Sequence, residues 1–491
     1  MTRSLSALAR PCPWPWLLAL AACAFSGCNA PGTRLTPSCT LPLPSPPDWR
    51  LHADGTLLRD GLGRVVFLRG VDAGGRSKFA PYVPFDYAPG QYDAALASYM
   101  DRAASWGIDA MRVPFTWAAL EPTQGQRDDD WLSRYQALLD AAWARGIWTV
   151  VDFHQDIYAE AFCGDGFPAW TIANPPATPY TCPNPSWQFE YFQDPNVKAA
   201  FDAFWASGSA VQGEYLAAWD AVIARFAGEA GVLGFEPINE PASGSAGETT
   251  FEATTLTDFF SSVVPHVRAL APSSLVFVDA PGVDSAGPGT AMTRPEGDGI
   301  VFAPHFYPIT DANPSVVLPG IQYWAGVGAA WNVPVFLGEF GVSHDVDGAF
   351  DFMTAHFAAL DELGMSGTEW EYSVSGQSWN EESDGVVAAD GTEYPVALAL
   401  VRPFARAVAG DSVSQAWDPD AGAYTLSYAA PSTPAALTTT ITEVELPERA
   451  FPSGYSVTLS SGCYDATTAP GRLLVQPDPD AAQTTVRIAP R

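Results

Sequence analysis

Short apolar runs alternate with amphipathic runs along most of residues 51–407. The apolar runs are rich in Val, Ile and Phe, as buried strands are, and the runs between them space their apolar residues as a helix facing a core does. This alternation predicts a (β/α)8 barrel, with an open doubly wound sheet as the alternative. No glycine-rich phosphate-binding turn follows the first strand, which disfavours the open sheet. The expected strands are 65–71, 109–115, 147–154, 232–239, 274–279, 300–305, 333–339 and 368–370. The expected helices are 93–106, 131–145, 215–226, 254–270, 350–363 and 395–407.

The pattern changes after Gly410. Short alternating runs follow, separated by turn residues, and they predict a small all-β sandwich over 410–491. The barrel domain is then expected over 49–409. The stretch 29–48 holds many Pro and Ser without periodicity, which predicts a linker.

Residues 1–28 have the organisation of an export signal. A basic start precedes an apolar stretch at 14–22 that is short for a membrane span. The tetrapeptides that end at Cys23 and Cys28 both resemble the lipobox of bacterial lipoproteins, so one of these cysteines is expected to carry a lipid that tethers the chain to a membrane. Ordinary cleavage with free secretion is the alternative. We therefore predict an exported monomer, extracellular or lipid-anchored at the bacterial cell envelope.

The four cysteines beyond the signal region predict disulfides, because export implies an oxidising compartment. Cys163 and Cys182 lie in one long loop and form the natural pair. Cys39 and Cys463 remain, and the sequence alone does not fix their connectivity.

The chain is strongly acidic, with 24 Lys+Arg against 55 Asp+Glu and a formal net charge of -31. Such a charge repels nucleic acids and anionic membrane surfaces and suits an uncharged ligand. The sequence offers no metal-ligand cluster, phosphate loop or cofactor fingerprint, so we expect a protein without cofactors.

Two glutamates stand at the ends of expected strands. Glu240 closes Gly-Phe-Glu-Pro-Ile-Asn-Glu, and Glu339 closes Val-Phe-Leu-Gly-Glu. A carboxylate beside a core strand is costly to bury unless it has a partner or a task. Glycoside hydrolysis requires a pair of carboxyl groups, and a retaining enzyme holds them about 5–5.5 Å apart.

Further polar and aromatic residues stand where the other strands end, and in a (β/α)8 barrel those ends form the active face. Taken singly, such residues are more often structural, as a hydrogen-bonded histidine or a core tryptophan is. Their coincidence at the ends of one predicted barrel is the informative feature. The residues are Arg112, His154, Asp156, Asn239, His305, Tyr307 and Trp370.

In their order and strand positions these residues resemble glycoside hydrolase family 5, the family of many cellulases, over most of residues 50–405. The resemblance implies that Glu339 is the nucleophile of a retaining reaction and that Glu240 is first the acid and then the base. Arg112 is suited to keep Glu339 ionised, because a nearby cation favours a carboxylate. The resemblance further implies that Asn239 holds the sugar 2-hydroxyl and Tyr307 hydrogen-bonds the nucleophile. His305 would lie beside the acid, and Trp370 would form the floor under the reacting ring.

Finer features are similar to the bacterial endoglycoceramidases of this family. They are Phe153-His154-Gln155-Asp156 followed by Tyr158, the Gly164-Asp165-Gly166 turn, Lys78 after the first strand and the appended β domain. The similarity implies that Lys78, His154 and Asp156 bind sugar hydroxyls. It also implies cleavage of the β-glycosidic bond between the glycan and the ceramide of glycosphingolipids.

Alternatives are another β-glycosidase of this fold, acting on a glucosyl lipid, a steryl glucoside or a β-glucan, and a non-catalytic glycan- or lipid-binding surface protein. For Lys78 the alternative is a solvated loop lysine.

The sequence leaves the local structure open at two places. Pro237 falls inside the expected strand 232–239, where a proline cannot donate to the ladder, so we expect a bulge there. The loop 157–212 holds a dozen aromatic residues, which suit a lipid aglycone, sugar stacking or a loop that packs on itself.

Overall fold

The computed structural model describes residues 38–491 except 47, 288, 310–311 and 434–435. The predicted export signal at 1–28, with Cys23 and Cys28, lies outside the described residues. Among the residues that are described, no helix combines the length and apolar character needed to cross a bilayer.

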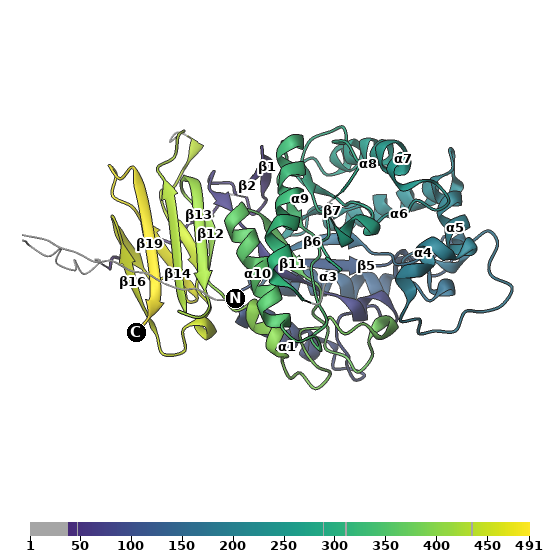
Figure 1. The fold of residues 1–491 in the computed structure, drawn as a ribbon, viewed down its shortest axis with the longest axis horizontal. Coiled ribbons are helices and arrows are strands. Elements are labelled where there is room, and N and C mark those ends of the chain that lie inside the picture. The colour runs from purple at the N-terminus through teal and green to yellow at the C-terminus, as the bar shows by residue number, and fades with distance from the viewer. Residues whose placement is uncertain (1–37, 47, 288, 310–311, 434–435) are drawn as a thin grey trace, which may run out of the picture. The chain divides into compact units, whose positions relative to one another are not determined.

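Eight parallel strands form the barrel that the alternating pattern predicts (Figure 1). Their order around the sheet is β10-β11-β4-β5-β6-β7-β8-β9. The parallel bridges Phe302–Val335 and His305–Glu339 join the last strand to the first, so the sheet closes. The strands are β4 Arg69–Asp72, β5 Ala110–Phe115, β6 Trp148–Phe153, β7 Val232–Glu236, β8 Leu275–Val278, β9 Ile300–Phe302, β10 Phe336–Leu337 and β11 Ser366–Glu369.

Helices cover the outside of the barrel and bury its apolar surface. The long ones are α1 Tyr92–Trp106, α3 Asp129–Trp143, α6 Ala210–Phe226, α8 Thr257–Leu270, α9 Val317–Trp331 and α10 Ala349–Leu363. Shorter helices are α2 Trp117–Leu120, α4 Glu190–Gln193, α5 Pro195–Trp205 and α7 Glu248–Phe251. We did not predict α9, whose glycines and uniformly apolar run weaken the helical pattern.

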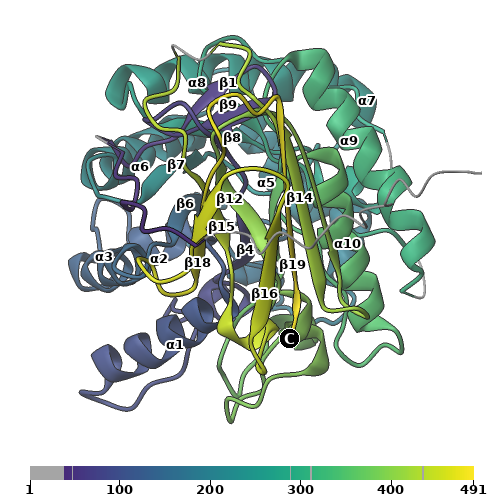
Figure 2. The same cartoon turned by 90° about the vertical axis from the view of Figure 1, so that its left-hand side faces the viewer.

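Two antiparallel sheets form the C-terminal sandwich, which faces the viewer in Figure 2. One has the order β1-β2-β3-β12-β15-β18-β17 and the other β13-β14-β19-β16, with apolar side chains buried between them. The first comprises β1 His52–Asp54, β2 Leu57–Arg59, β3 Val65–Val66, β12 Phe404–Val408, β15 Thr442–Glu445, β18 Arg472–Gln476 and β17 Cys463–Asp465. The second comprises β13 Asp411–Asp418, β14 Ala423–Ala429, β19 Gln483–Pro490 and β16 Tyr455–Leu459.

Two of the expected elements are wrong. The expected strand 65–71 is two strands, because β3 pairs antiparallel with β2 and β12 while β4 alone enters the barrel. The expected helix 395–407 is a short 3₁₀ turn, Pro395–Ala399, followed by β12. Pairing with β15 and β3 outweighs the helical preference of the alanines there, and the C-terminal sheet begins ahead of residue 410.

The expected disulfide Cys163–Cys182 forms within the long loop. Cys39 and Cys463, whose pairing the sequence leaves open, also form a disulfide, which fastens part of the expected linker 29–48 to β17. A bridge between Ser38 and Tyr464 adds to this attachment.

Candidate active site

The two predicted glutamates meet at the carboxyl-terminal end of the barrel. Glu240 lies four residues after β7 ends, and Glu339 lies two residues after β10 ends. A carboxylate oxygen of each lies within 4.8 Å of the other and of a His305 ring nitrogen. Glu240 keeps 12% of its side chain exposed and Glu339 7%, so both are nearly enclosed while still accessible from outside.

Arg112 on β5 is the electrostatic centre of the site and is fully buried. Its guanidinium donates to Glu339 Oε1 at 2.6 Å and forms a two-pronged pair with Glu236 at 2.8 Å on each prong. Further contacts reach Asp72 Oδ1 at 3.2 Å and Asn239 Oδ1 at 2.7 Å. From β5, this one cation thereby aligns groups on β4, on β7 and just after it, and after β10.

The environment of Glu339 favours its ionised form. Tyr307 donates its hydroxyl to Glu339 Oε2 at 2.9 Å, and His305 Nδ1 lies 3.5 Å from the same oxygen. Burial acts to raise the pKa of Glu339, but the charges of His305 and Arg112 outweigh burial and lower that pKa below its ordinary value. An ionised carboxylate with a free approach is suited to attack an electrophilic carbon.

His305 links the two glutamates. Its Nδ1 lies 2.8 Å from Glu240 Oε1, and its Nε2 lies 3.5 Å from buried Asp279. Burial acts to lower the pKa of His305, yet the carboxylates of Asp279, Glu339 and Glu240 raise it to about 10. The surrounding carboxylates therefore favour the charged form of the ring, and its Nδ1 faces Glu240.

The backbone around Glu240 is held from several directions. The expected bulge at Pro237 does not form: β7 ends at Glu236, so the missing proline N–H falls outside the ladder. Trp219 Nε1 donates to the Pro237 carbonyl at 3.1 Å. Asp279 Oδ2 accepts the Glu240 N–H at 2.8 Å, and Glu240 has a φ of 41°, a left-handed conformation rare for a glutamate.

Close backbone approach adds to this constraint. A Cβ on Gly282 would lie 2.6 Å from Glu240 Oε2. Gln155 Nε2 also donates to the Glu240 carbonyl at 2.9 Å. The backbone of Glu240 is therefore fixed by hydrogen bonds, and Gly282 leaves little space beside its side chain.

Lys78 is buried, so its interpretation as a solvated loop lysine is wrong. Its ammonium donates to Asp156 Oδ2 at 2.6 Å and lies 4.4 Å from the centre of the Trp370 ring. Trp370 stacks on His154 with ring centres 5.2 Å apart and planes 6° apart. The four residues form one continuous wall beside Glu339.

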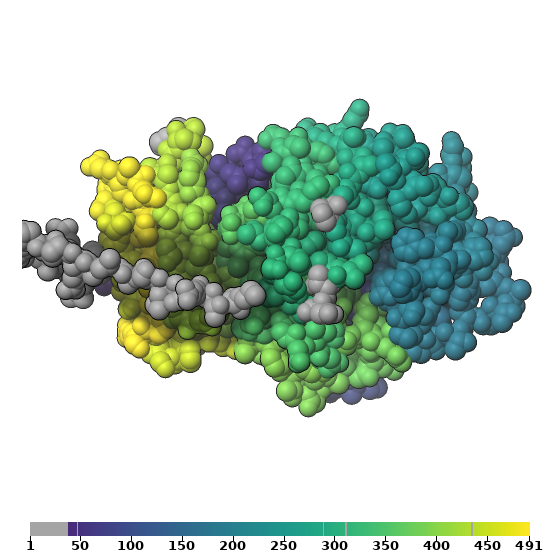
Figure 3. All heavy atoms as spheres, viewed as in Figure 1, coloured from purple at the N-terminus to yellow at the C-terminus, as the bar shows by residue number. Residues whose placement is uncertain are grey.

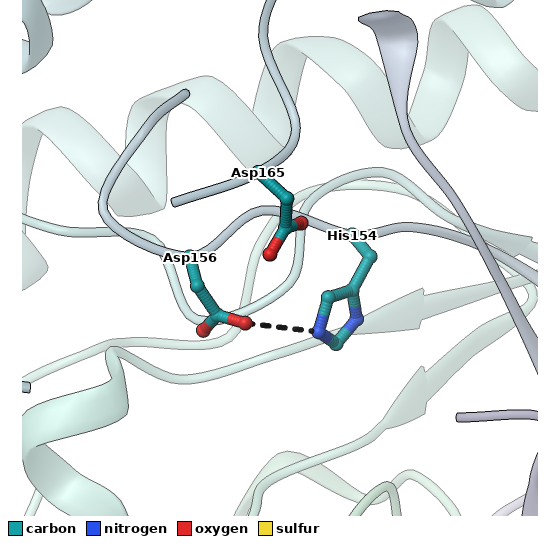
Figure 4. A group of neighbouring side chains, drawn as sticks. All are labelled: His154, Asp156 and Asp165. Carbon is teal, nitrogen blue, oxygen red and sulfur yellow. Dashed lines mark ion pairs between the residues drawn. The ribbon is translucent and has the colours of Figure 1, made fainter. Parts of the chain in front are cut away.

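Asp165 converges with His154 and Asp156 of this wall (Figure 4). Ligand atoms of the three lie within 4.8 Å of one another, a donor set that fits a cation. Lys78 supplies a positive charge to this group, because its ammonium pairs with Asp156. Burial acts to lower the pKa of Lys78, but Asp156 and Glu382 raise it, so the ammonium stays charged.

Several buried carboxyl groups of the site were missed in the sequence analysis. Four of them interrupt, end or directly follow a barrel strand, and that position is the signal that could have revealed them. Asp165 and Glu382 lie in loops and carry no such signal. Asp165 has both oxygens without a protein partner, and burial raises its pKa well above the ordinary value. The missed residues are Asp72, Asp152, Glu236, Asp279, Asp165 and Glu382.

Most aromatic residues of the loop 157–212 pack on one another. Tyr158 stacks on Phe167 at 4.1 Å, and Phe204 contacts Phe167 edge to face. Phe189 and Phe192 are the exceptions, with 59% and 49% of their surface exposed. Figure 3 shows this segment in blue as a continuous surface at one end of the barrel.

Comparisons with known proteins give matches over both the barrel and the C-terminal domain. The model of the cellulase family, glycosyl hydrolase family 5, matches residues 80–376, and that of the glycoside hydrolase family 5 C-terminal domain matches 402–489. Endoglycoceramidase I of Rhodococcus hoagii (strain 103S) is 29% identical over 461 residues, which span 88% of this chain and 86% of that protein.

Two solved structures of endo-glycoceramidase II from Rhodococcus sp. are also similar. One is described as a lactosyl-enzyme intermediate and the other as a ganglioside GM3 complex. Each aligns with a TM-score of 0.74 and 26% identity, over 89% of this chain and 100% of that chain. With a family model matching more than half of its residues, the chain belongs to glycoside hydrolase family 5, in the endoglycoceramidase-like branch.

Proposed function

We propose that this glycosidase cleaves the β-glycosidic bond between the glycan and the ceramide of glycosphingolipids, with retention of configuration. The observation that carries the proposal is the Glu240–Glu339 pair, whose carboxylate oxygens approach within 4.8 Å at the mouth of the barrel. Retaining enzymes hold their carboxyl groups about 5–5.5 Å apart, whereas inverting enzymes leave about 6.5–9.5 Å for a water molecule.

In the first step Glu339 attacks the anomeric carbon of the sugar next to ceramide. Arg112 and Tyr307 hold its two oxygens, one each, so the carboxylate is ionised and oriented. Glu240 donates a proton to the leaving oxygen as the C–O bond breaks, and the ceramide leaves as an alcohol. The sugar is then esterified to Glu339.

In the second step water replaces ceramide. Glu240, now a carboxylate, takes a proton from the water as its oxygen attacks the anomeric carbon, and Glu339 leaves. His305 Nδ1 lies 2.8 Å from Glu240 Oε1 and can hydrogen-bond this carboxyl group in both steps, while it serves as acid and then as base. Two inversions give net retention.

The choice of a ceramide aglycone rests on the relatives. Endoglycoceramidases match along nearly the whole chain, barrel and C-terminal domain together. A lactosyl-enzyme intermediate described for one of them supports a covalent mechanism here. Exposed Phe189 and Phe192 on the long loop offer apolar surface to a lipid.

Export to an oxidising compartment is part of the proposal. Both disulfides of the described residues fit it, because such bonds persist outside the cytosol. Incorporation of a radiolabelled fatty acid that is lost in a Cys28→Ser or Cys23→Ser chain would identify the lipidated cysteine. Labelling of neither would favour free secretion.

Mass spectrometry of the products from a mixed glycolipid panel tests the function. The expected products are intact oligosaccharide and ceramide. Stepwise release of single glucose units, or cleavage of a β-glucan without lipid, would favour another glycosidase of this fold. No product from any glycolipid would refute the proposal.

Two variants and a control test the assigned roles. Glu339→Gln and Glu240→Gln are each expected to lower the rate by at least about 10²–10⁴-fold. The control Glu214→Gln changes an exposed glutamate on α6 and is expected to leave activity intact. Wild-type activity in Glu339→Gln would overturn the nucleophile assignment.

A further inference from the structure

A second cavity, the outer pocket, lies beside the active site. Its volume is about 330 Å³, and three segments line it, each following the carboxyl-terminal end of a barrel strand: β4, β10 and β11. Such segments form the functional face of a barrel. The residues that matter for its chemistry are Arg76, His344, Glu371, Glu381, Glu382 and Tyr394.

The outer pocket shares its inner wall with the catalytic site. Glu382 and Trp379 both line the pocket. The Lys78 Nζ lies 3.6 Å from Glu382 Oε1 and 4.0 Å from the centre of the Trp379 ring. Glu371 directly follows Trp370, the aromatic residue beside His154. A glycan that extends past Lys78 would therefore reach this pocket.

The lining has the chemistry of a sugar site. His344 and Tyr394 stack with ring centres 3.7 Å apart and planes 9° apart, forming an aromatic platform at the rim. Four serines add hydroxyl groups that can donate or accept. Ser373 donates to Glu371 Oε2 at 2.6 Å, while Glu382 Oε2 is buried beneath the pocket without a hydrogen-bond partner.

The acidic groups of the pocket differ in their charge. Glu381 is exposed, whereas burial raises the pKa of Glu371 to about 7 and that of Glu382 well above its ordinary value. The guanidinium of Arg76 is the cation in the lining, but it pairs with Asp86 at 3.2 Å and donates to two backbone carbonyls. Because the lining leaves no guanidinium free, an anionic sugar would meet the exposed carboxylate of Glu381 without a cation to pair with, and the polar lining does not suit an acyl chain.

We propose that the outer pocket binds the outer sugars of an uncharged glycan headgroup and disfavours headgroups that carry sialic acid there. The inference rests on the proposed function, because it places the inner sugars beside Lys78. It deepens that function by naming neutral, extended glycosphingolipids as the preferred substrates.

Three glycolipids test the proposal: lactosylceramide, a neutral glycosphingolipid with four sugars, and a sialylated one on the same core. We compare kcat/KM for the wild type, His344→Ala and Glu381→Lys. His344→Ala is expected to lower kcat/KM for the four-sugar substrate about tenfold, or ~1.4 kcal/mol, and to leave lactosylceramide within about twofold. Glu381 is exposed, so Glu381→Lys is expected to fold and to raise kcat/KM for the sialylated substrate several-fold relative to the neutral one.

The outcomes separate the two proposals. Equal effects of each variant on short and long headgroups would refute the proposed role of the outer pocket, even with an active wild type. An enzyme that releases no glycan from any lipid would overturn the proposed function instead. In that case calorimetric binding of the free neutral tetrasaccharide, weakened by His344→Ala, would still support the pocket, and no binding would refute it.

Discussion

Replacing Arg112 with methionine removes the cation that organises the active site. The side chain keeps a similar length and loses its charge. Four buried carboxyl groups then lose their common partner: Glu236, Asp72, Asp152 and Glu339. Removing one partner of a buried ion pair costs about 3–5 kcal/mol, a large share of the roughly 5–15 kcal/mol that stabilises a typical domain.

The pH dependence of this loss follows from the pKa values. Burial raises the pKa of Asp72 and Glu236 although Arg112 acts to lower both, so without Arg112 both pKa values rise further. A group whose folded pKa exceeds its unfolded pKa stabilises the fold at low pH and loses that contribution as pH rises. The lowered pKa of Glu339 in the wild type acts in the opposite direction. The difference in stability between wild type and variant therefore grows as pH rises and shrinks as pH falls.

Urea unfolding at pH 5, 6, 7 and 8, followed by tryptophan fluorescence, measures this difference. The control is Arg145→Met, which breaks an exposed pair with Asp101 and is expected to cost at most about 1 kcal/mol at every pH. A loss in Arg112→Met that does not change with pH, or one equal to the control, would refute the electrostatic role of Arg112.

Three further substitutions test single contacts. Tyr307→Phe removes the hydrogen bond to Glu339, the proposed nucleophile, so kcat/KM is expected to fall roughly 10–150-fold. The acid limb of its pH profile is expected to move to higher pH, and an unchanged profile would contradict this. Gly282→Ala places a methyl group against Glu240, so kcat is expected to fall about 10²-fold with unchanged circular dichroism, and full activity would show that the acid can move. Cys163→Ser opens the loop disulfide, so the free energy of unfolding is expected to fall by about 3 kcal/mol under oxidising conditions, with no difference from the wild type after reduction.

Much of the barrel could be predicted because its strands carry a strong local pattern. Runs such as Leu275–Val278 are apolar throughout, as strands buried on both faces are. The segment 404–408 was assigned wrongly because its alanines favour a helix, whereas its partners β15 and β3 come from distant parts of the sequence. Long-range pairing of that kind leaves no local signal.

The strand-end residues of the site could be found one by one, but not their partnerships. Arg112 and Glu236 lie on β5 and β7, which are separated by β6, and they meet inside the barrel. A single sequence does not show that contact. The same holds for Lys78 and Glu382, which come from segments after β4 and β11 and define where the outer pocket begins.

The stereochemistry of the first-formed product tests the central claim most directly. Proton NMR of the sugar released from a β-glycosidic substrate, recorded within the first minutes, distinguishes the two anomers before they interconvert. The Glu240–Glu339 geometry predicts that the β anomer forms first and that the α anomer grows in later. An α anomer formed first would show that water attacks directly, and it would contradict the assignment of Glu339 as the nucleophile.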